Sequence, residues 1–217
     1  MNKLITAHEA IKKVKNGDCI MVGGFLAGGH PETLVKSLAD SKVNNLTIIS
    51  NDTGTTECAI YHVIKNGQAS KIIASYIGSN PETGRLLMTG EADVQLFPQG
   101  TLAEKIRAGG SGLGGFLTPV GIGTVVEEGK RKMEVDGKEY LLELPLKANV
   151  ALIKAYKADE NGNLIFNGSA LNFNAVMAMA ADYVIAEVDE YVSIGEIHPN
   201  DVVVPGIIVD AIVKVGE

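Results

Sequence analysis

A glycine-rich loop between a short apolar run and a helical pattern constrains the fold of this chain more than any other feature. The apolar run Asp18 to Val22 predicts a strand, and the pattern from Glu32 to Leu38 predicts a helix. The connection between them, Gly23 to Pro31, contains the glycines Gly23, Gly24, Gly28 and Gly29. A strand, a glycine loop and a helix in this order are typical of the first half of a βαβ unit.

The same alternation recurs along the chain. Further strands are predicted at residues 46–50, 71–75, 93–97, 150–153 and 183–186, and helices at 57–64, 101–107 and 174–181. Strands separated by helices need crossover connections, which favour parallel pairing. The predicted fold class is therefore α/β, with a mostly parallel open sheet and flanking helices.

Two local patterns add detail to this fold. Thr6 followed by Glu9 is a capping-box pattern and predicts a first helix that stops at Asn16-Gly17. Residues 132–142 predict a β-hairpin, because Asp136-Gly137 suits a two-residue turn. No linker, repeat or low-complexity tract interrupts the sequence, so we expect one domain spanning residues 1–217.

Composition excludes several classes of protein. Hydrophobic residues make up 46% of the chain, which is enough for a packed core, and the net charge of -7 argues against nucleic acid or anionic lipid as a partner. No apolar run is long enough to cross a bilayer as a helix. Residues 1–10 contain Lys3, His8 and Glu9 instead of a secretory apolar stretch, so we expect a cytoplasmic protein. Cys19 and Cys58 predict buried, reduced thiols and no metal site.

The loop from Gly23 to Pro31 is the strongest site candidate. It follows a strand end and opens a helix, and its glycines would let backbone N–H groups approach an anion or a developing oxyanion. A tight connection whose glycines only satisfy backbone geometry explains the same pattern equally well. His30, beside Pro31 in a loop, is expected to be a solvated residue without a chemical role.

Gln99 is a second candidate. It follows the predicted strand 93–97 and precedes the predicted helix 101–107, the position where open α/β sheets place ligands. Its amide suits donation to a thioester carbonyl or an oxyanion, although a helix-entry turn that holds its own backbone is an equal reading. Lys130 to Lys132 is the densest basic cluster, and a charge run at the start of a hairpin is usually solvated.

Most enzyme signatures are absent from the sequence. There is no metalloprotease motif, no P-loop and no nucleophile elbow. Gly110 to Gly115 matches the G-x-G-x-x-G pattern, but it follows a predicted helix where a dinucleotide site needs a strand. A nucleotide-dependent oxidoreductase is therefore retained only as an alternative function.

The stretch Asn16 to Pro31 resembles the signature of the α subunit of family I CoA-transferases at every specified position. That signature is [DN]-[GN], two free residues, three apolar residues, G-G-F, three free residues and G-x-P. The resemblance extends nearly end to end and is closest to the α chains of the acetate/acetoacetate and butyrate-acetoacetate enzymes. It includes residues 50–53, 74–85, 98–115, 121–129 and 172–174.

The resemblance implies a heteromeric enzyme, typically two α and two β chains, that moves CoA between a short-chain acyl-CoA and a short carboxylate. The implied route is ping-pong, with no tightly bound cofactor and with a nucleophilic glutamate on the β subunit. By resemblance, Gln99 is the amide that faces the reacting carbonyl, and neither Asn51 nor His30 receives a firm role. The resemblance assigns CoA binding to Gly23, Gly24, Phe25, Leu26, Ala27, Gly28 and Gly29.

One segment of this chain partly matches the β-chain motif that carries the nucleophilic glutamate. Asp159-Glu160-Asn161-Gly162 shares E-N-G with the β-chain motif S-E-N-G, but Asp stands in place of Ser and Asn163 follows where an apolar residue is expected. Asn161-Gly162 is ordinary turn chemistry, so a turn is the favoured interpretation. A non-catalytic binding subunit of the same fold is the remaining alternative.

Overall fold

The predicted glycine loop follows a central strand of a parallel sheet, at the end where the carboxyl ends of the strands meet. The structure is a computed structural model that describes residues 3–26 and 28–216. The sheet has the strand order β11-β10-β8-β1-β2-β3-β4, and β9 pairs with β8 off this path. All neighbours in that order are parallel, and only β9 is antiparallel. The strands are β1 Cys19–Val22, β2 Leu46–Ser50, β3 Ala69–Ala74, β4 Asp93–Leu96, β8 Ala148–Asp159, β9 Leu164–Ile165, β10 Ala181–Val192 and β11 Ala211–Lys214.

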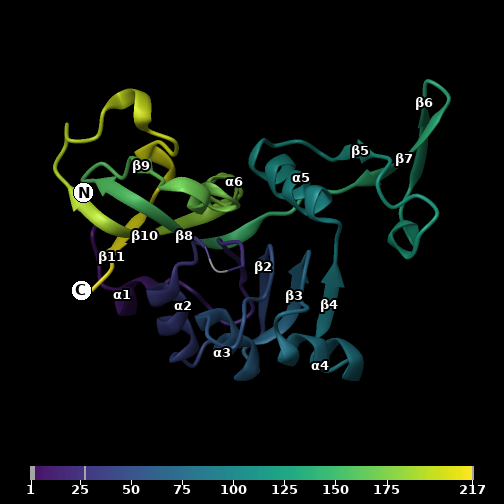
Figure 1. The fold of residues 1–217 in the computed structure, drawn as a ribbon, viewed down its shortest axis with the longest axis horizontal. Coiled ribbons are helices and arrows are strands. Elements are labelled where there is room, and N and C mark those ends of the chain that lie inside the picture. The colour runs from purple at the N-terminus through teal and green to yellow at the C-terminus, as the bar shows by residue number, and fades with distance from the viewer. Residues whose placement is uncertain (1–2, 27, 217) are drawn as a thin grey trace.

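Helices cover both faces of the sheet, as predicted for an α/β fold (Figure 1). One face carries α1 Ala7–Ile11, α2 Glu32–Ala39, α3 Ala59–Lys65 and α4 Pro81–Thr89, and the other carries α5 Gln99–Gly110 and α6 Asn174–Ala178. Short 3₁₀ turns lie at η1 Val125–Glu127, η2 Gly168–Leu171, η3 Pro199–Asp201 and η4 Gly206–Ile208.

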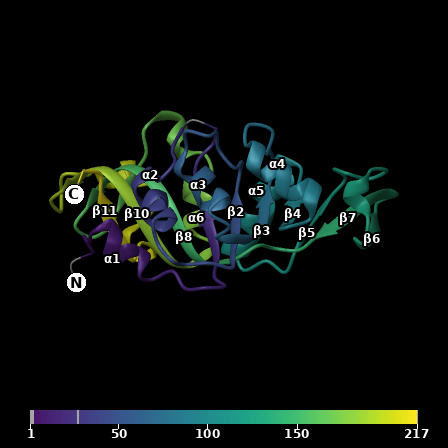
Figure 2. The same ribbon diagram turned by 90° about the horizontal axis from the view of Figure 1, so that it is seen from below.

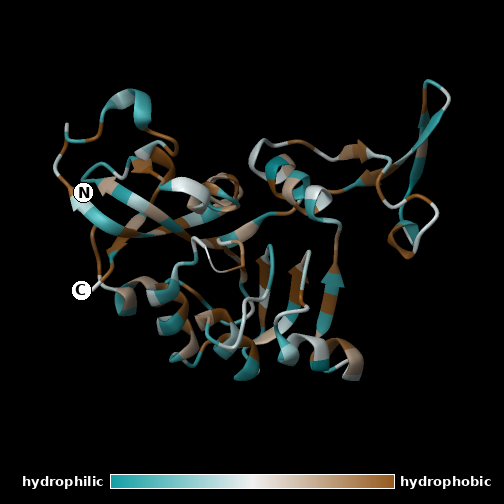
Figure 3. Cartoon of the chain, in the orientation of Figure 1, coloured by the Kyte–Doolittle hydropathy of each residue, from teal (hydrophilic) through white to brown (hydrophobic). Residues whose placement is uncertain are grey.

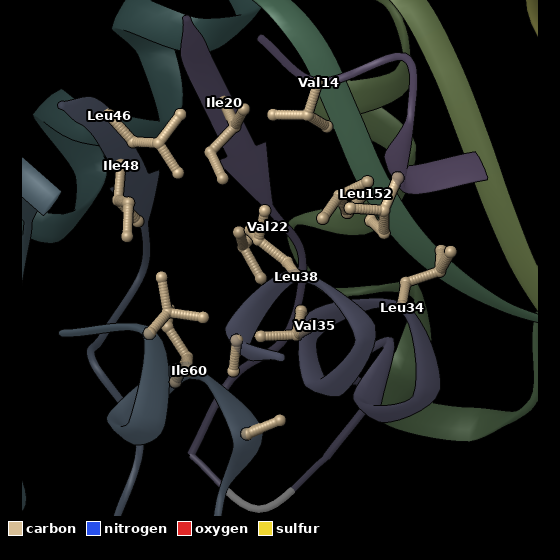
Figure 4. Packing of buried hydrophobic residues seen from close by; sticks show 14 of the residues in the cluster. Val14, Ile20, Val22, Leu34, Val35, Leu38, Leu46, Ile48, Ile60 and Leu152 are labelled. Atoms are coloured by element: carbon tan, nitrogen blue, oxygen red, sulfur yellow. The ribbon is translucent and has the colours of Figure 1, made fainter. Parts of the chain in front are cut away.

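The core is divided between the two faces because successive strand side chains point in opposite directions. Ile20 and Val22 belong to the cluster under α1 to α4, whereas Met21 between them belongs to the cluster under α5 and α6. Figure 4 shows the first cluster, in which Leu34 and Leu38 of α2 meet the strands with no exposed surface. Figure 3 shows hydrophobic residues along the central strands and polar ones on the outer turns of the helices. Each such buried side chain contributes roughly 1.5–3 kcal/mol to folding.

An antiparallel arm extends from one end of the body (Figures 1 and 2). Its strands, in the order β5-β7-β6, are β5 Phe116–Thr118, β6 Lys132–Val135 and β7 Lys138–Glu143. The predicted hairpin is confirmed, because Asp136 and Gly137 both have positive φ, 51° and 74°. At the base of the arm the buried Glu143 carboxylate pairs with Lys105 of α5 at 2.9 Å and with Lys130.

Several predicted boundaries shift in the structure. The capping box is present, with the Glu9 amide 3.2 Å from the Thr6 hydroxyl, but α1 ends at Ile11, before Asn16. The strands β8 and β10 are 12 residues long each, because their parallel pairing with each other continues beyond the short apolar runs. No helix among residues 3–26 and 28–216 is long and apolar enough to cross a membrane.

The end of α5 and the burial of the two cysteines also differ from what the sequence predicts. Gly109 and Gly110 lie beyond the predicted helix 101–107, yet they form the last turn of α5. A Cβ on Gly109 would lie 1.9 Å from the Leu146 carbonyl oxygen. α5 therefore packs too closely against the Leu146 backbone for any residue larger than glycine at position 109. Cys19 and Cys58 are free thiols as predicted, but both are half-buried instead of buried.

Candidate active site

The predicted site residues lie together at the carboxyl edge of the sheet. The glycine loop follows β1, Asn51 follows β2 and Gln99 begins α5 shortly after β4. Because β1 to β4 are parallel neighbours, their carboxyl ends share one edge, where open α/β sheets bind ligands. Asn51 and Gln99 thus each follow the carboxyl end of a strand, and they lie within hydrogen-bonding distance of each other.

A chain of hydrogen bonds links the glycine loop to Gln99. The Leu26 amide donates to Asp52 Oδ2 at 2.8 Å, and Asn51 Nδ2 donates to the same oxygen at 2.7 Å. Gln99 Nε2 then donates to Asn51 Oδ1 at 2.8 Å. Ser75 Oγ shares that acceptor at 3.0 Å. Asn51 and Asp52 are 2% and 1% exposed, so the bond between these two side chains is shielded from water.

Asp52 determines which way the two amide side chains face. Asn51 presents its NH₂ to Asp52, which leaves its carbonyl oxygen to accept from Gln99. Gln99 in turn presents its NH₂ to Asn51. One N–H of Gln99 is used in this way, and the second N–H donates to no residue that the structure describes.

Most of the described backbone N–H groups of the loop already have acceptors within the protein. Phe25 and Gly28 exchange two backbone hydrogen bonds of 2.9 Å, with Leu26 held at φ 48° between them. The Gly23 amide donates to the Leu152 carbonyl at 3.0 Å. The N–H groups of Gly24 and Gly29 donate to no residue that the structure describes. Ala27, also assigned to CoA binding, lies outside the described residues.

His30 is half-buried within the loop, so the prediction of a solvated residue is wrong, while its lack of a chemical role stays a prediction. Its ring lies against Gly24, where an added Cβ would come within 2.2 Å of Nδ1. Nε2 bonds to the Leu26 carbonyl, while Nδ1 is buried without a partner among the described residues. Gly24 has φ 121°, so both its backbone conformation and the adjacent ring require glycine.

The start of α2 is not open to a ligand anion, contrary to the expectation for a loop that opens a helix. Glu187 Oε2 accepts a hydrogen bond of 3.0 Å from the Leu34 amide in the first turn of α2. Lys154 lies 3.4 Å from the other oxygen of this buried carboxylate. Burial raises the pKa of Glu187 above its ordinary value, against the lowering effect of its hydrogen bonds and of Lys154. Free donors therefore lie in the loop and not at the helix terminus.

A hollow of about 310 Å³ joins the loop to Gln99. Its lining consists of Phe25, Gln99, Gly100, Ala103, Asn172, Phe173 and Val176. These described residues supply two amide side chains and apolar surface, but no carboxylate, thiol, hydroxyl or imidazole. Elsewhere in residues 3–26 and 28–216, no group of three His, Cys, Asp or Glu residues could hold a metal ion. No role was predicted from the sequence for Asp52 or Asn172. The only indication was their position, since Asp52 follows a strand and Asn172 precedes a helix.

Two competing segments have structural explanations. Gly110 ends α5 and Gly115 precedes β5, so the G-x-G-x-x-G match lacks the strand–loop–helix context of a dinucleotide site. Glu160 is exposed in the turn after β8, where Asp159 Oδ1 accepts from the amides of Asn161 and Asn163 at 3.0 and 2.9 Å. Glu160 lines a different hollow, beside Lys3 and Pro205.

A model of one protein family, coenzyme A transferase, matches residues 4–215. The chain belongs to the coenzyme A transferase family. The family resemblance in the Asn16 to Pro31 signature is thereby confirmed.

Full-length relatives and a solved structure agree with this family. The alpha subunit of acetate CoA-transferase from Escherichia coli strain K12 is 52% identical over 97% of this chain and 96% of its own length. The acetoacetyl-CoA:acetate/butyrate CoA transferase alpha subunit of Clostridium acetobutylicum is 50% identical over 99% of both chains. The crystal structure of the acyl-CoA transferase YdiF from E. coli O157:H7, a thioester complex with CoA, has a TM-score of 0.88 and 25% identity. That match includes 98% of this chain, which spans 47% of the YdiF chain.

Proposed function

We propose that this chain is the α subunit of a heteromeric CoA-transferase, which moves CoA between a short-chain acyl-CoA and a short carboxylate. The observation that carries the proposal is the hollow beside Gln99, which offers hydrogen-bond donors but no nucleophile among the described residues. Such a hollow suits half of an active site. The names of the two full-length relatives, both alpha subunits, support a separate β chain.

In the proposed reaction a glutamate of the β chain attacks the acyl-CoA carbonyl. A tetrahedral oxyanion forms and collapses to an acyl-glutamyl anhydride, with CoA leaving as the thiolate. The thiolate then attacks the glutamyl carbonyl of the anhydride, which releases the first carboxylate and leaves a glutamyl-CoA thioester. The second carboxylate reverses these steps to give the new acyl-CoA. CoA is a substrate throughout, and the proposal includes no tightly bound cofactor.

This chain contributes charge stabilisation and a dry surface. The second N–H of Gln99 has no acceptor among the described residues and suits a developing oxyanion. The apolar lining from Phe25, Phe173 and Val176 keeps water from the anhydride, which water would hydrolyse. We assign the loop Gly23 to Gly29 to the CoA moiety and Gln99 to the reacting carbonyl.

The substrates, assembly and location complete the proposal. Acetyl-CoA, acetoacetyl-CoA and butyryl-CoA, with the matching carboxylates, are the proposed substrates, following the names of the two relatives. We propose an α2β2 assembly. A cytoplasmic location is consistent with the free thiols of Cys19 and Cys58, because such thiols persist in a reducing compartment.

The test is reconstitution with a β chain. We expect no CoA exchange between acetyl-CoA and acetoacetate or butyrate with either chain alone, and turnover when the two are mixed. The variant Glu160→Ala of this chain is the matched control and should support normal turnover, because Glu160 belongs to a turn. Borohydride trapping with mass spectrometry should locate the thioester on the β chain. Turnover by the α chain alone, lost in Glu160→Ala, would refute the proposal.

A further inference from the structure

Asn174, the first residue of α6, lies underneath the glycine loop with no exposed surface. Its Oδ1 accepts a hydrogen bond of 2.8 Å from the Lys154 amide of β8. Its Nδ2 donates to the Gly29 carbonyl at 2.9 Å and to the Ala170 carbonyl at 2.8 Å. The amide therefore directs one hydrogen to the glycine loop and the other to η2, and its oxygen to the sheet.

The shape of the loop depends on this side chain. A Cβ on Gly23 would lie 1.8 Å from Asn174 Oδ1, although Gly23 itself does not have a positive φ. A Cβ on Gly29 would lie 3.1 Å from Asn174 Nδ2, and Gly29 has φ 73°. Gly23 is thus glycine because Asn174 occupies the adjacent space. Gly29 combines the same crowding with a backbone conformation that favours glycine.

The hydrogen bonds around Gly29 also set the direction of its N–H, which donates to no residue that the structure describes. The Gly28 carbonyl accepts from the Phe25 amide at 2.9 Å and from Asn172 Nδ2 at 3.2 Å. Because a trans peptide holds its C=O and N–H on opposite sides, the Gly29 N–H points away from those two donors. The bond from Asn174 to the Gly29 carbonyl fixes the next peptide plane, so the backbone is restrained on both sides of Gly29.

We propose that Asn174 is a positioning residue of the transferase, which holds the glycine loop in the conformation that binds the CoA moiety. This inference rests on the proposed function. It differs from a general stabilising role, because it ties one buried amide to the binding of one substrate. Asn174 is buried beneath the loop and acts on the ligand only through Gly29.

The first experiment compares Asn174→Ala with Gln68→Ala in the assembled α–β enzyme. Gln68 is a matched control, since it is 5% exposed and donates to the carbonyls of Leu38 and Val43 at 2.9 Å, at the start of β3. Both variants lose buried hydrogen bonds and should unfold at a lower temperature. Only Asn174→Ala should raise the KM for acetyl-CoA, on the order of tenfold. Its KM for the acceptor carboxylate should stay within about twofold of wild type.

The second experiment separates positioning from stability. Gly23→Ala alone places a methyl group on Asn174 Oδ1 and should destabilise the protein strongly or prevent folding. In the double variant Gly23→Ala/Asn174→Ala the methyl group enters the space that the amide vacates. The double variant should therefore unfold at nearly the same temperature as Asn174→Ala. Its KM for acetyl-CoA should stay raised, because the bond to the Gly29 carbonyl is still missing.

Two outcomes would overturn the inference. One is a KM for acetyl-CoA in Asn174→Ala that changes no more than in Gln68→Ala. The other is a double variant whose KM returns to the wild-type value together with its thermal stability. Failure of the proposed function is distinguishable from both, because the wild-type α–β mixture would then show no CoA exchange in the first place.

Discussion

The segments Gly23 to Gly29 and Gly109 to Gly115 are both rich in glycine, yet different atoms lie beside their glycines. Next to Gly23 and Gly24 are polar side chains, the amide of Asn174 from α6 and the ring of His30 at the end of the same loop. Next to Gly109 and Gly110 are mainly backbone atoms, of Leu146 and Met179. Polar side chains around the first segment hold a loop in a defined shape, whereas backbone around the second allows α5 to pack closely. A glycine count does not separate these two uses.

The strongest test of this difference is Gln99→Ala, which removes an N–H from the polar network of the first segment. We expect kcat to fall on the order of ten- to a thousandfold, as the loss of one oxyanion donor does. The α–β assembly should form normally, because Gln99 is exposed and its side chain hydrogen-bonds only to Asn51 Oδ1 among the described residues. Steady-state kinetics and size-exclusion chromatography check both points. Unchanged kinetics would remove Gln99 from the chemistry and leave the chain as a non-catalytic subunit.

The second segment should respond in stability and not in catalysis. Gly109→Ala would bring a Cβ to 1.9 Å from the Leu146 carbonyl oxygen, and a backbone atom has little freedom to move away. We expect a loss of about 1–3 kcal/mol in the free energy of unfolding, measured by urea denaturation, with kcat preserved. Gly114→Ala is the matched control, since nothing lies within 4 Å of its added Cβ, and it should be nearly neutral. Equal losses in both variants would contradict the packing explanation.

The smallest expected effect concerns Glu187, whose carboxylate accepts a hydrogen bond from the first turn of α2, the helix that follows the glycine loop. Burial raises the folded-state pKa of Glu187 above its ordinary value of 4.5. The folded protein therefore keeps a proton that the unfolded chain releases, and the contribution of Glu187 to stability declines as pH rises from 4.5 through the raised folded pKa. Glu187→Gln cannot titrate, so the free energy of unfolding should fall less steeply with pH over this range. Urea denaturation at several pH values measures the two slopes. Identical slopes would show that the pKa of Glu187 is the same in both states.

Much of the fold follows from patterns within a few residues. The capping box of Thr6 and Glu9, the Asp136-Gly137 turn and the alternation of strands and helices each depend on neighbours in the sequence, and each is confirmed. The helix ends were less predictable, because a close contact such as that of Gly109 with Leu146 decides whether glycines stay in a helix. The expectation of one domain stays a prediction.

The site could be predicted only in part. The position of Gln99 between a strand and a helix follows from the sequence pattern, but its role in catalysis stays a prediction. The contacts that shape the loop join residues far apart in the chain, and nothing in the local sequence indicates them. Asp52 is 26 residues from Leu26, Asn174 is 145 residues from Gly29, and Glu187 is 153 residues from Leu34. His30 was misjudged for the same reason, because the loop folds back over its ring.

The place of β1 in the sheet has a consequence for how the chain is made. β1 lies between β2 and β8, and β8 begins only at Ala148. On a ribosome that adds roughly 5–20 residues per second, one edge of β1 stays without its partner for on the order of ten seconds after it is synthesised. During that interval the nascent α/β layer of β1 to β4 presents unpaired backbone groups, the kind of edge at which chains aggregate. Chaperone demand during translation should therefore peak before residue 148 is made and decline once β8 emerges from the exit tunnel.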